Sequence, residues 1–134
     1  MSRAILFDDF VPGAVLGAAT QVCEPALAEC WQRIYGSDPA LGANGAAEAA
    51  SLAVVMMMRA YFEVVTPRPP GNIHARQRLT LDGLPRAGES IRTVVSCRAR
   101  ELRRERRHVE LALDGRGDGG RAIYRGIITL IWAA

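Results

Sequence analysis

The sequence predicts an α+β fold, in which an antiparallel sheet of about five strands wraps around one long central helix. The stretch from Gly45 to Val65 is rich in Ala, Leu and Met and lacks proline, so it favours one long helix. From residue 73 onward, apolar and polar residues alternate in successive runs, which is typical of strands with one buried face. At 134 residues the chain, 1–134, has the length of a single domain.

The first third of the chain predicts one strand and one short helix. Pro12-Gly13 indicates a turn, and Val15 to Glu24 reads as the first strand. A short amphipathic helix is predicted from Ala26 to Tyr35. Pro25 is consistent with its start, because proline is well tolerated there. The next segment, Gly36 to Asn44, is full of turn-forming residues and predicts a loop that leads into the long helix.

The long helix is expected to begin after Asn44 as its N-cap and to end before Pro67. It is apolar on almost every side, so it must be enclosed on almost every side. A sheet covers only one side of a helix, and we therefore expect a second subunit on the other. The uncharged run from Ala49 to Met58 is far shorter than the roughly 20 residues that a membrane span needs.

Four further strands are predicted after the proline-rich linker at 66–72: 73–82, 89–102, 108–114 and 121–132. In the first of these, the alternation places His74 and the arginines opposite a second set of residues: Ile73, Ala75, Leu79 and Leu81. In the long second strand, one face is expected to carry Ile91, Thr93, Val95, Cys97 and Ala99. The last strand ends apolar on both faces, as a central strand does.

The bulk composition is that of an ordinary globular protein, with 49% apolar and 23% charged residues. The N-terminus carries no signal-peptide pattern, and no long apolar run indicates a membrane. Cys23, Cys30 and Cys97 are odd in number and widely spaced, which favours buried thiols in a reducing cytoplasm. No cysteine–histidine spacing indicates a metal site, and we predict no metal and no cofactor.

The net charge of +3 comes entirely from arginine, since the chain has no lysine. A cluster of six arginines occupies residues 98–107: Arg98, Arg100, Arg103, Arg104, Arg106 and Arg107. Such a cluster is most simply a solvated hairpin tip, but it can also bind phosphate. Nucleic acid is not expected as a partner, because no aromatic side chains are interleaved with the arginines.

Two segments resemble the MaoC-like branch of the hotdog superfamily. Phe7 to Leu16, FDDFVPGAVL, is similar to that family's opening, where an aromatic and acidic stretch precedes a glycine and the first strand. Gly83 to Ile91, GLPRAGESI, is similar to its turn into a long strand. The resemblance implies a hotdog fold that pairs into dimers. It also implies a hydratase or dehydratase that acts on acyl thioesters of coenzyme A or acyl carrier protein.

The sequence departs from this family where the chemistry is performed. The hydratases carry an Asp and a His five residues apart, in a D-x-N-P-x-H loop before the central helix. If Asp38-Pro39 takes the place of the Asn-Pro pair, the two catalytic positions hold Gly36 and Leu41. If Asp38 is instead the catalytic Asp, its partner position holds Ala43. Neither alignment supplies a histidine, and the two histidines of the chain, His74 and His108, fall in predicted strands.

The start of the long helix still suits a thioester carbonyl. Its N–H groups lack partners within the helix and carry a partial positive charge, so Asn44 and Gly45 are our candidate substrate-binding residues. Glu48 lies in the first turn, where related dehydratases and thioesterases place a carboxylate. Glu48 is also simply a favourable acid at a helix start. We assign Glu48 and Asp38 as candidate catalytic residues, and Arg98 and Arg100 as candidate contacts to carrier phosphates.

Three functions are consistent with these observations. The first is an acyl-thioester-binding protein that lacks the hydratase dyad and forms the non-catalytic half of a heteromeric enzyme. The second is an active thioesterase or dehydratase that uses Glu48 or Asp38. The third is a dimeric interaction module without a substrate pocket. In each case the expected partner is another hotdog subunit, in a homodimer or a heterodimer.

Overall fold

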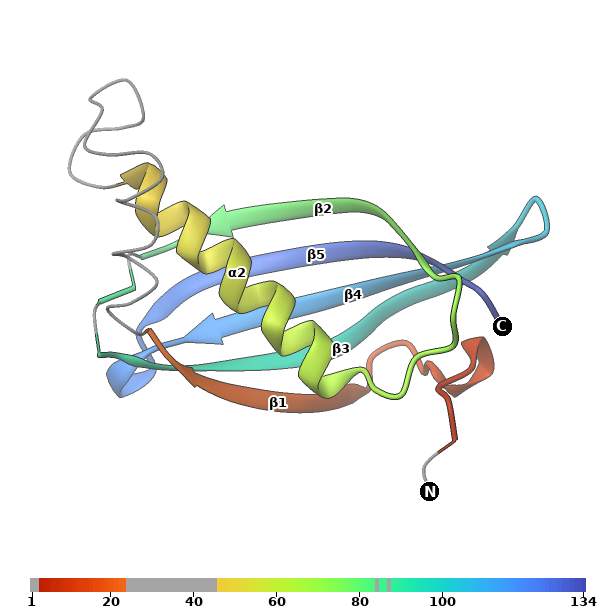
Figure 1. The fold of residues 1–134 in the computed structure, drawn as a ribbon, viewed down its shortest axis with the longest axis horizontal. Coiled ribbons are helices and arrows are strands. Elements are labelled where there is room, and N and C mark those ends of the chain that lie inside the picture. The colour runs from red at the N-terminus through yellow and green to blue at the C-terminus, as the bar shows by residue number, and fades with distance from the viewer. Residues whose placement is uncertain (1–2, 24–45, 84, 87) are drawn as a thin grey trace.

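The computed structural model describes residues 3–23, 46–83, 85–86 and 88–134, and the side chains of its long helix from Ser51 onward. Figure 1 shows its elements along the chain. They are η1 (Phe7–Asp9), β1 (Val15–Val22), α2 (Ala46–Val64), β2 (Ile73–Leu81), β3 (Ser90–Arg103), β4 (Arg106–Arg116), η4 (Asp118–Gly120) and β5 (Ala122–Trp132). The predicted short helix at 26–35 and the loop at 36–44 lie outside the described residues.

The five strands form one antiparallel sheet in the order β1-β3-β4-β5-β2, and α2 crosses one face of it (Figure 1). This arrangement confirms the predicted α+β class and the central helix. Strands β1 and β2 form the two edges of the sheet, and α2 connects them in the sequence. Among the described residues, no helix is long and apolar enough to cross a membrane.

The core lies between α2 and the sheet. Met56 and Met57, from the methionine run of α2, are almost completely buried. A Cβ at Gly126 of β5 would lie 2.2 Å from the Met57 sulfur, so the glycine leaves room for the Met57 side chain against the sheet. Each large apolar side chain buried here contributes about 1.5–3 kcal/mol relative to exposure. The methionines therefore serve as core, as polarisable side chains that fill irregular space.

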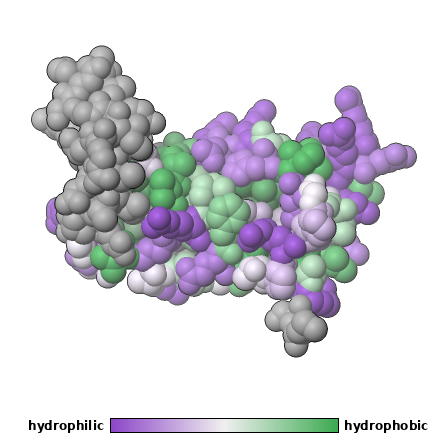
Figure 2. Space-filling model, viewed as in Figure 1, coloured by the Kyte–Doolittle hydropathy of each residue, from purple (hydrophilic) through white to green (hydrophobic). Residues whose placement is uncertain are grey.

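The side of α2 that faces away from the sheet is only partly covered. Val55 is 38% exposed and Phe62 is 50% exposed, and the charged residues Arg59 and Glu63 of the same helix are also exposed. Arg68 stacks over the Phe62 ring at 4.7 Å and donates a hydrogen bond to the Val65 carbonyl, 2.8 Å away. Figure 2 shows this face as a mixture of hydrophobic and hydrophilic patches. The prediction that a second subunit covers it stays a prediction.

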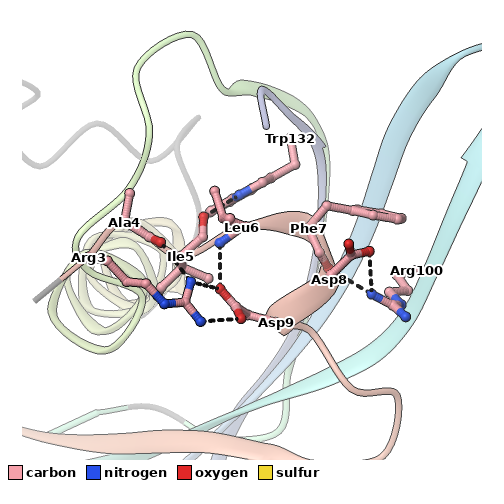
Figure 3. Close-up of polar contacts among 9 residues, drawn as sticks. All are labelled: Arg3, Ala4, Ile5, Leu6, Phe7, Asp8, Asp9, Arg100 and Trp132. Carbon is pink, nitrogen blue, oxygen red and sulfur yellow. Dashed lines mark hydrogen bonds and ion pairs between the residues drawn. The ribbon is translucent and has the colours of Figure 1, made fainter.

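The N-terminal segment around FDDF packs against the C-terminal end of the chain (Figure 3). Phe10 is fully buried and packs edge-on against Trp132, with ring centroids 4.9 Å apart. The Trp132 indole N–H donates to the Ile5 carbonyl at 2.8 Å. Asp9 accepts from the Leu6 N–H at 2.8 Å and from both terminal nitrogens of Arg3 at 2.7 Å. The segment that resembles the MaoC opening is thus architectural in this chain.

Two bulges overturn the predicted faces of two strands. In β3, the register shifts between Cys97 and Ala99, so Ala99 pairs with Glu110 on the outer face and does not join Cys97 on the inner one. In β2, the register shifts between His74 and Arg76. Ile73 therefore lies on the outer face with the arginines, and it is 52% exposed. Period-two alternation assigns faces correctly only where no extra residue interrupts the ladder.

Glu89, from the second MaoC-like segment, is a buried structural carboxylate. Its side chain is 1% exposed and accepts hydrogen bonds from the Asp118 N–H at 2.9 Å, the Arg86 N–H at 3.0 Å and the Arg121 guanidinium. Burial raises its pKa, but these donors outweigh burial and hold the pKa of Glu89 below its ordinary value. The absence of a side chain at Gly117 leaves room for this carboxylate.

We expect Glu89→Gln to lower the free energy of unfolding at pH 7 by roughly 2–4 kcal/mol, because an uncharged amide cannot satisfy three donors. A depressed folded-state pKa stabilises the fold above the unfolded value near 4.5 and loses this effect as pH falls through the folded value. The deficit of Glu89→Gln should therefore shrink below about pH 4. Urea unfolding between pH 3 and pH 7 measures it, and a pH-independent deficit would contradict the assignment.

Candidate functional site

The start of α2 is the site that the sequence favours, and the structure describes part of it. Helix α2 begins at Ala46, and Glu48 is in its first turn. The side chain of Glu48 is not among those described. The other predicted residues, Asp38, Asn44 and Gly45, lie outside the described residues. Their assignments as catalytic or substrate-binding residues therefore stay predictions.

The start of α2 lies at the end of the sheet where β1 and β2 finish and where β3 and β5 begin (Figure 1). Gln21, near the end of β1, donates a hydrogen bond from its side-chain amide to the Met56 carbonyl at 2.9 Å. This contact joins an edge strand to the middle of the helix. The sequence alone does not indicate a role for Gln21, because a polar residue in an edge strand gives no signal of such a contact.

A buried pair of hydroxyl groups lies on the helix side of the sheet, near this end. The Thr93 and Tyr124 hydroxyls form a short hydrogen bond of 2.5 Å, and both residues are almost completely buried. Burial raises the pKa of Tyr124 to about 12, although the bond to Thr93 lowers it. The Tyr124 ring occupies the space that a Cβ at Gly115 would need. The phenol is therefore neutral at physiological pH and acts as a fixed hydrogen-bonding group.

Both histidines lie at the opposite end of the sheet. His74 is the second residue of β2 and is exposed, while His108 is the third residue of β4 and is half-buried. In Figure 1, β2 begins and the β3–β4 hairpin turns at the end away from the start of α2. The chain contains no other histidine. Neither histidine of the chain therefore lies near the start of α2, where a histidine–carboxylate dyad would need one.

The structure separates the two arginines that we assigned to carrier phosphates. Arg98 lies at the β3 bulge, 3.7 Å from the Glu110 carboxylate. The bulge directs Arg100 to the helix side, where it donates to the Phe7 carbonyl at 3.0 Å and the Asp8 carboxylate at 3.3 Å (Figure 3). Its guanidinium also stacks on the Phe7 ring at 5.2 Å. Arg100 thus holds η1 against β3, and a phosphate contact from either arginine stays a prediction.

Within the described residues, no group of three or more His, Cys, Asp or Glu side chains is arranged to hold a metal ion. Cys23 and Cys97 are buried free thiols, as predicted, and burial raises the pKa of both. The described part of the start of α2 offers helix N–H groups and, in Glu48, an acid in the first turn.

Comparison with known proteins identifies the fold. No protein-family model matches the sequence, and no curated protein matches it significantly. A MaoC-like dehydratase from Rhodospirillum rubrum has a similar structure, with a TM-score of 0.78 and 16% identity over 98% of this chain and 99% of that one. The ChsH1–ChsH2 complex from Mycobacterium tuberculosis is also similar, with a TM-score of 0.64 and 13% sequence identity over 92% of this chain and 98% of that one.

The fluoroacetyl-CoA-specific thioesterase FlK is also similar, with a TM-score of 0.67 and 17% identity over 91% of this chain and 94% of that one. At these identities the likeness concerns the fold. The chain has the hotdog fold, in the form found in MaoC-like dehydratases, as the sequence resemblance implied.

The buried hydroxyl pair yields a testable coupling. Tyr124→Phe and Thr93→Val should each lower the free energy of unfolding by about 1–3 kcal/mol, because each leaves a buried hydroxyl without a partner. The double variant should lose less than the sum of the two, since it removes both polar groups. Urea unfolding of the four proteins measures the coupling. Strict additivity would show that the two hydroxyls do not depend on each other.

Proposed function

We propose that this protein binds an acyl thioester of coenzyme A or acyl carrier protein at the start of α2. We further propose that it lacks the hydratase dyad and is the non-catalytic half of a heteromeric enoyl hydratase or hydroxyacyl dehydratase. The observation that carries the proposal is the position of both histidines, in β2 and β4, at the far end of a fold shared with MaoC-like dehydratases.

Hydration of an enoyl thioester needs a base that takes a proton from water and donors that stabilise the developing enolate oxygen. The first turn of α2 supplies N–H groups without helical partners, together with the positive end of the helix dipole. These groups can hold a thioester carbonyl. The proton transfer would then depend on a partner subunit that carries its own histidine and acid.

Strand β2 offers a place for such a partner. Among the described residues it pairs with β5 alone, at an edge of the sheet, and most of its residues are exposed. An unpaired edge presents N–H and C=O groups that another strand can satisfy. The two-component ChsH1–ChsH2 complex supports an assembly of two different hotdog chains. A homodimer is the alternative assembly.

The purified protein alone should bind crotonyl-coenzyme A without hydrating it. We expect a ligand-dependent rise in the melting temperature, because a ligand that binds only the folded state stabilises it. We also expect no loss of the enoyl absorbance over hours. Free coenzyme A, which carries the same diphosphate and pantetheine arm without the acyl thioester, is the control ligand. Complete hydration by this chain alone would refute the missing dyad, and the absence of any thermal shift would refute binding.

An active hydrolase is the second candidate, which the similarity to a fluoroacetyl-CoA-specific thioesterase supports. Here Glu48 or Asp38 would act as base or nucleophile. In that case a panel of acyl-coenzyme A substrates should show thiol release that falls at least 100-fold in Glu48→Ala or Asp38→Ala. Glu63→Ala is the matched control, because Glu63 is an exposed acid at the other end of α2. Turnover that survives both substitutions would exclude this mechanism.

If neither binding nor turnover is found, the third function of the sequence analysis is left, a dimeric interaction module. Stabilisation by coenzyme A or its acyl thioesters argues directly against it.

A further inference from the structure

The β3–β4 hairpin extends beyond the rest of the sheet and ends in a two-residue turn (Figure 1). Arg104 and Glu105 form the turn, and the last ladder pair is Arg103 with Arg106. Figure 2 shows the projecting tip as strongly hydrophilic. The tip is thus a separate structural feature, at the end of the sheet away from the start of α2.

A depression of about 650 Å³ on this tip is lined by four residues: Arg103, Arg104, Arg106 and His108. No acid belongs to its lining. Within the described part of the chain, these three guanidinium groups form no ion pair, whereas Arg98 and Arg100 each do. The nearest carboxylates in the ladder and turn are those of Glu101, opposite His108, and Glu105.

The local sequence opposes the conformation that it adopts. Arg103 and Arg106 face each other across the ladder, and like charges in that position destabilise a hairpin. Arg104 and Glu105 have φ values of 52° and 64°, in a region that glycine and asparagine favour in such turns. A chain selected only for a stable hairpin would carry neither feature. Departures of this kind are common where a surface serves a ligand.

We propose that the hairpin tip binds a ligand that carries adjacent phosphate groups, such as a nucleoside diphosphate or triphosphate or the diphosphate of coenzyme A. Guanidinium groups match phosphate oxygens with two parallel hydrogen bonds, which relieves the repulsion between Arg103 and Arg106. Residues 98–108 hold six arginines and two glutamates, a surplus of four charges in a chain whose net charge is +3. The positive charge is therefore concentrated at this tip.

This site is independent of the proposed thioester site in the same protomer. Strand β3 runs from the end where α2 begins to the tip and has 14 residues, which corresponds to roughly 45 Å at about 3.3 Å per residue. In coenzyme A a single pantetheine arm separates the thioester carbonyl from the diphosphate, and this arm is too short to join the two ends of one protomer. Phosphate binding at the tip can therefore succeed or fail whether or not α2 binds a thioester.

Isothermal titration of the 134-residue chain at low salt tests the proposal with three probes: pyrophosphate, ATP and coenzyme A. We expect saturable binding that weakens at least tenfold in Arg103→Ala/Arg106→Ala. Arg59→Ala/Arg92→Ala is the matched control, because it removes two exposed arginines elsewhere, and its affinity should stay within twofold of wild type. Arg103→Lys/Arg106→Lys keeps the charge without the paired hydrogen bonds and should have intermediate affinity.

The order of affinities among the three probes identifies the source of the phosphates. Equal weakening in the tip variant and the control variant would refute the proposal, since it would show a response to net charge alone. The absence of saturable binding by all three probes would also refute it. So would tenfold tighter binding of a 20-nucleotide single strand or of a poly-glutamate peptide, which would assign the tip to a macromolecule. Circular dichroism of each variant verifies that it is folded.

Discussion

The close approach of α2 to the sheet is the constraint on which the rest of the structure depends. Gly126 in β5 lies beneath Met57, and Gly17 in β1 lies beneath Val64, where an added Cβ would come within 3.0 Å of a methyl group. A side chain at either position would force Met57 or Val64 to shift within a closely packed core. The apolar residues of α2 from Leu52 to Val65 pack in this core. The two glycines thus leave room for side chains of α2 against β5 and β1.

Around this core, the ends of the strands are fixed by polar contacts that span long stretches of chain. Trp132 is joined to Ile5, and Glu89 is joined to Asp118 and Arg121. Each contact closes a large loop of the chain. The entropic cost of closing a loop grows only slowly with its length, so these long loops cost little more than short ones. Ile5 lies just before the FDDF segment, whose Phe10 packs against Trp132, and Glu89 belongs to the GES segment. Both segments that resemble MaoC-like proteins therefore contribute to the packing of this fold.

The sequence was sufficient to predict the elements, because their periodicity reflects burial on one side of a helix or strand. The long helix was predicted as 45–65 and is Ala46–Val64, and all five strands were anticipated. The faces of Ile73 and Ala99 were predicted wrongly, since a bulge adds one residue and leaves the composition unchanged. The same effect separated Arg98 from Arg100, which differ by only two residues in sequence.

The candidate site was less predictable for a different reason. A helix start can be located from its composition, but whether it binds or catalyses depends on side chains that come from elsewhere in the fold. Here the fold carries His74 and His108 to the other end of the sheet, where the hairpin also concentrates the positive charge. One end therefore offers N–H groups and an acid, while the other offers guanidinium groups and imidazole. A single protomer does not bring these two chemistries together. Any reaction that needs both requires a second chain, aligned so that its far end meets the start of α2.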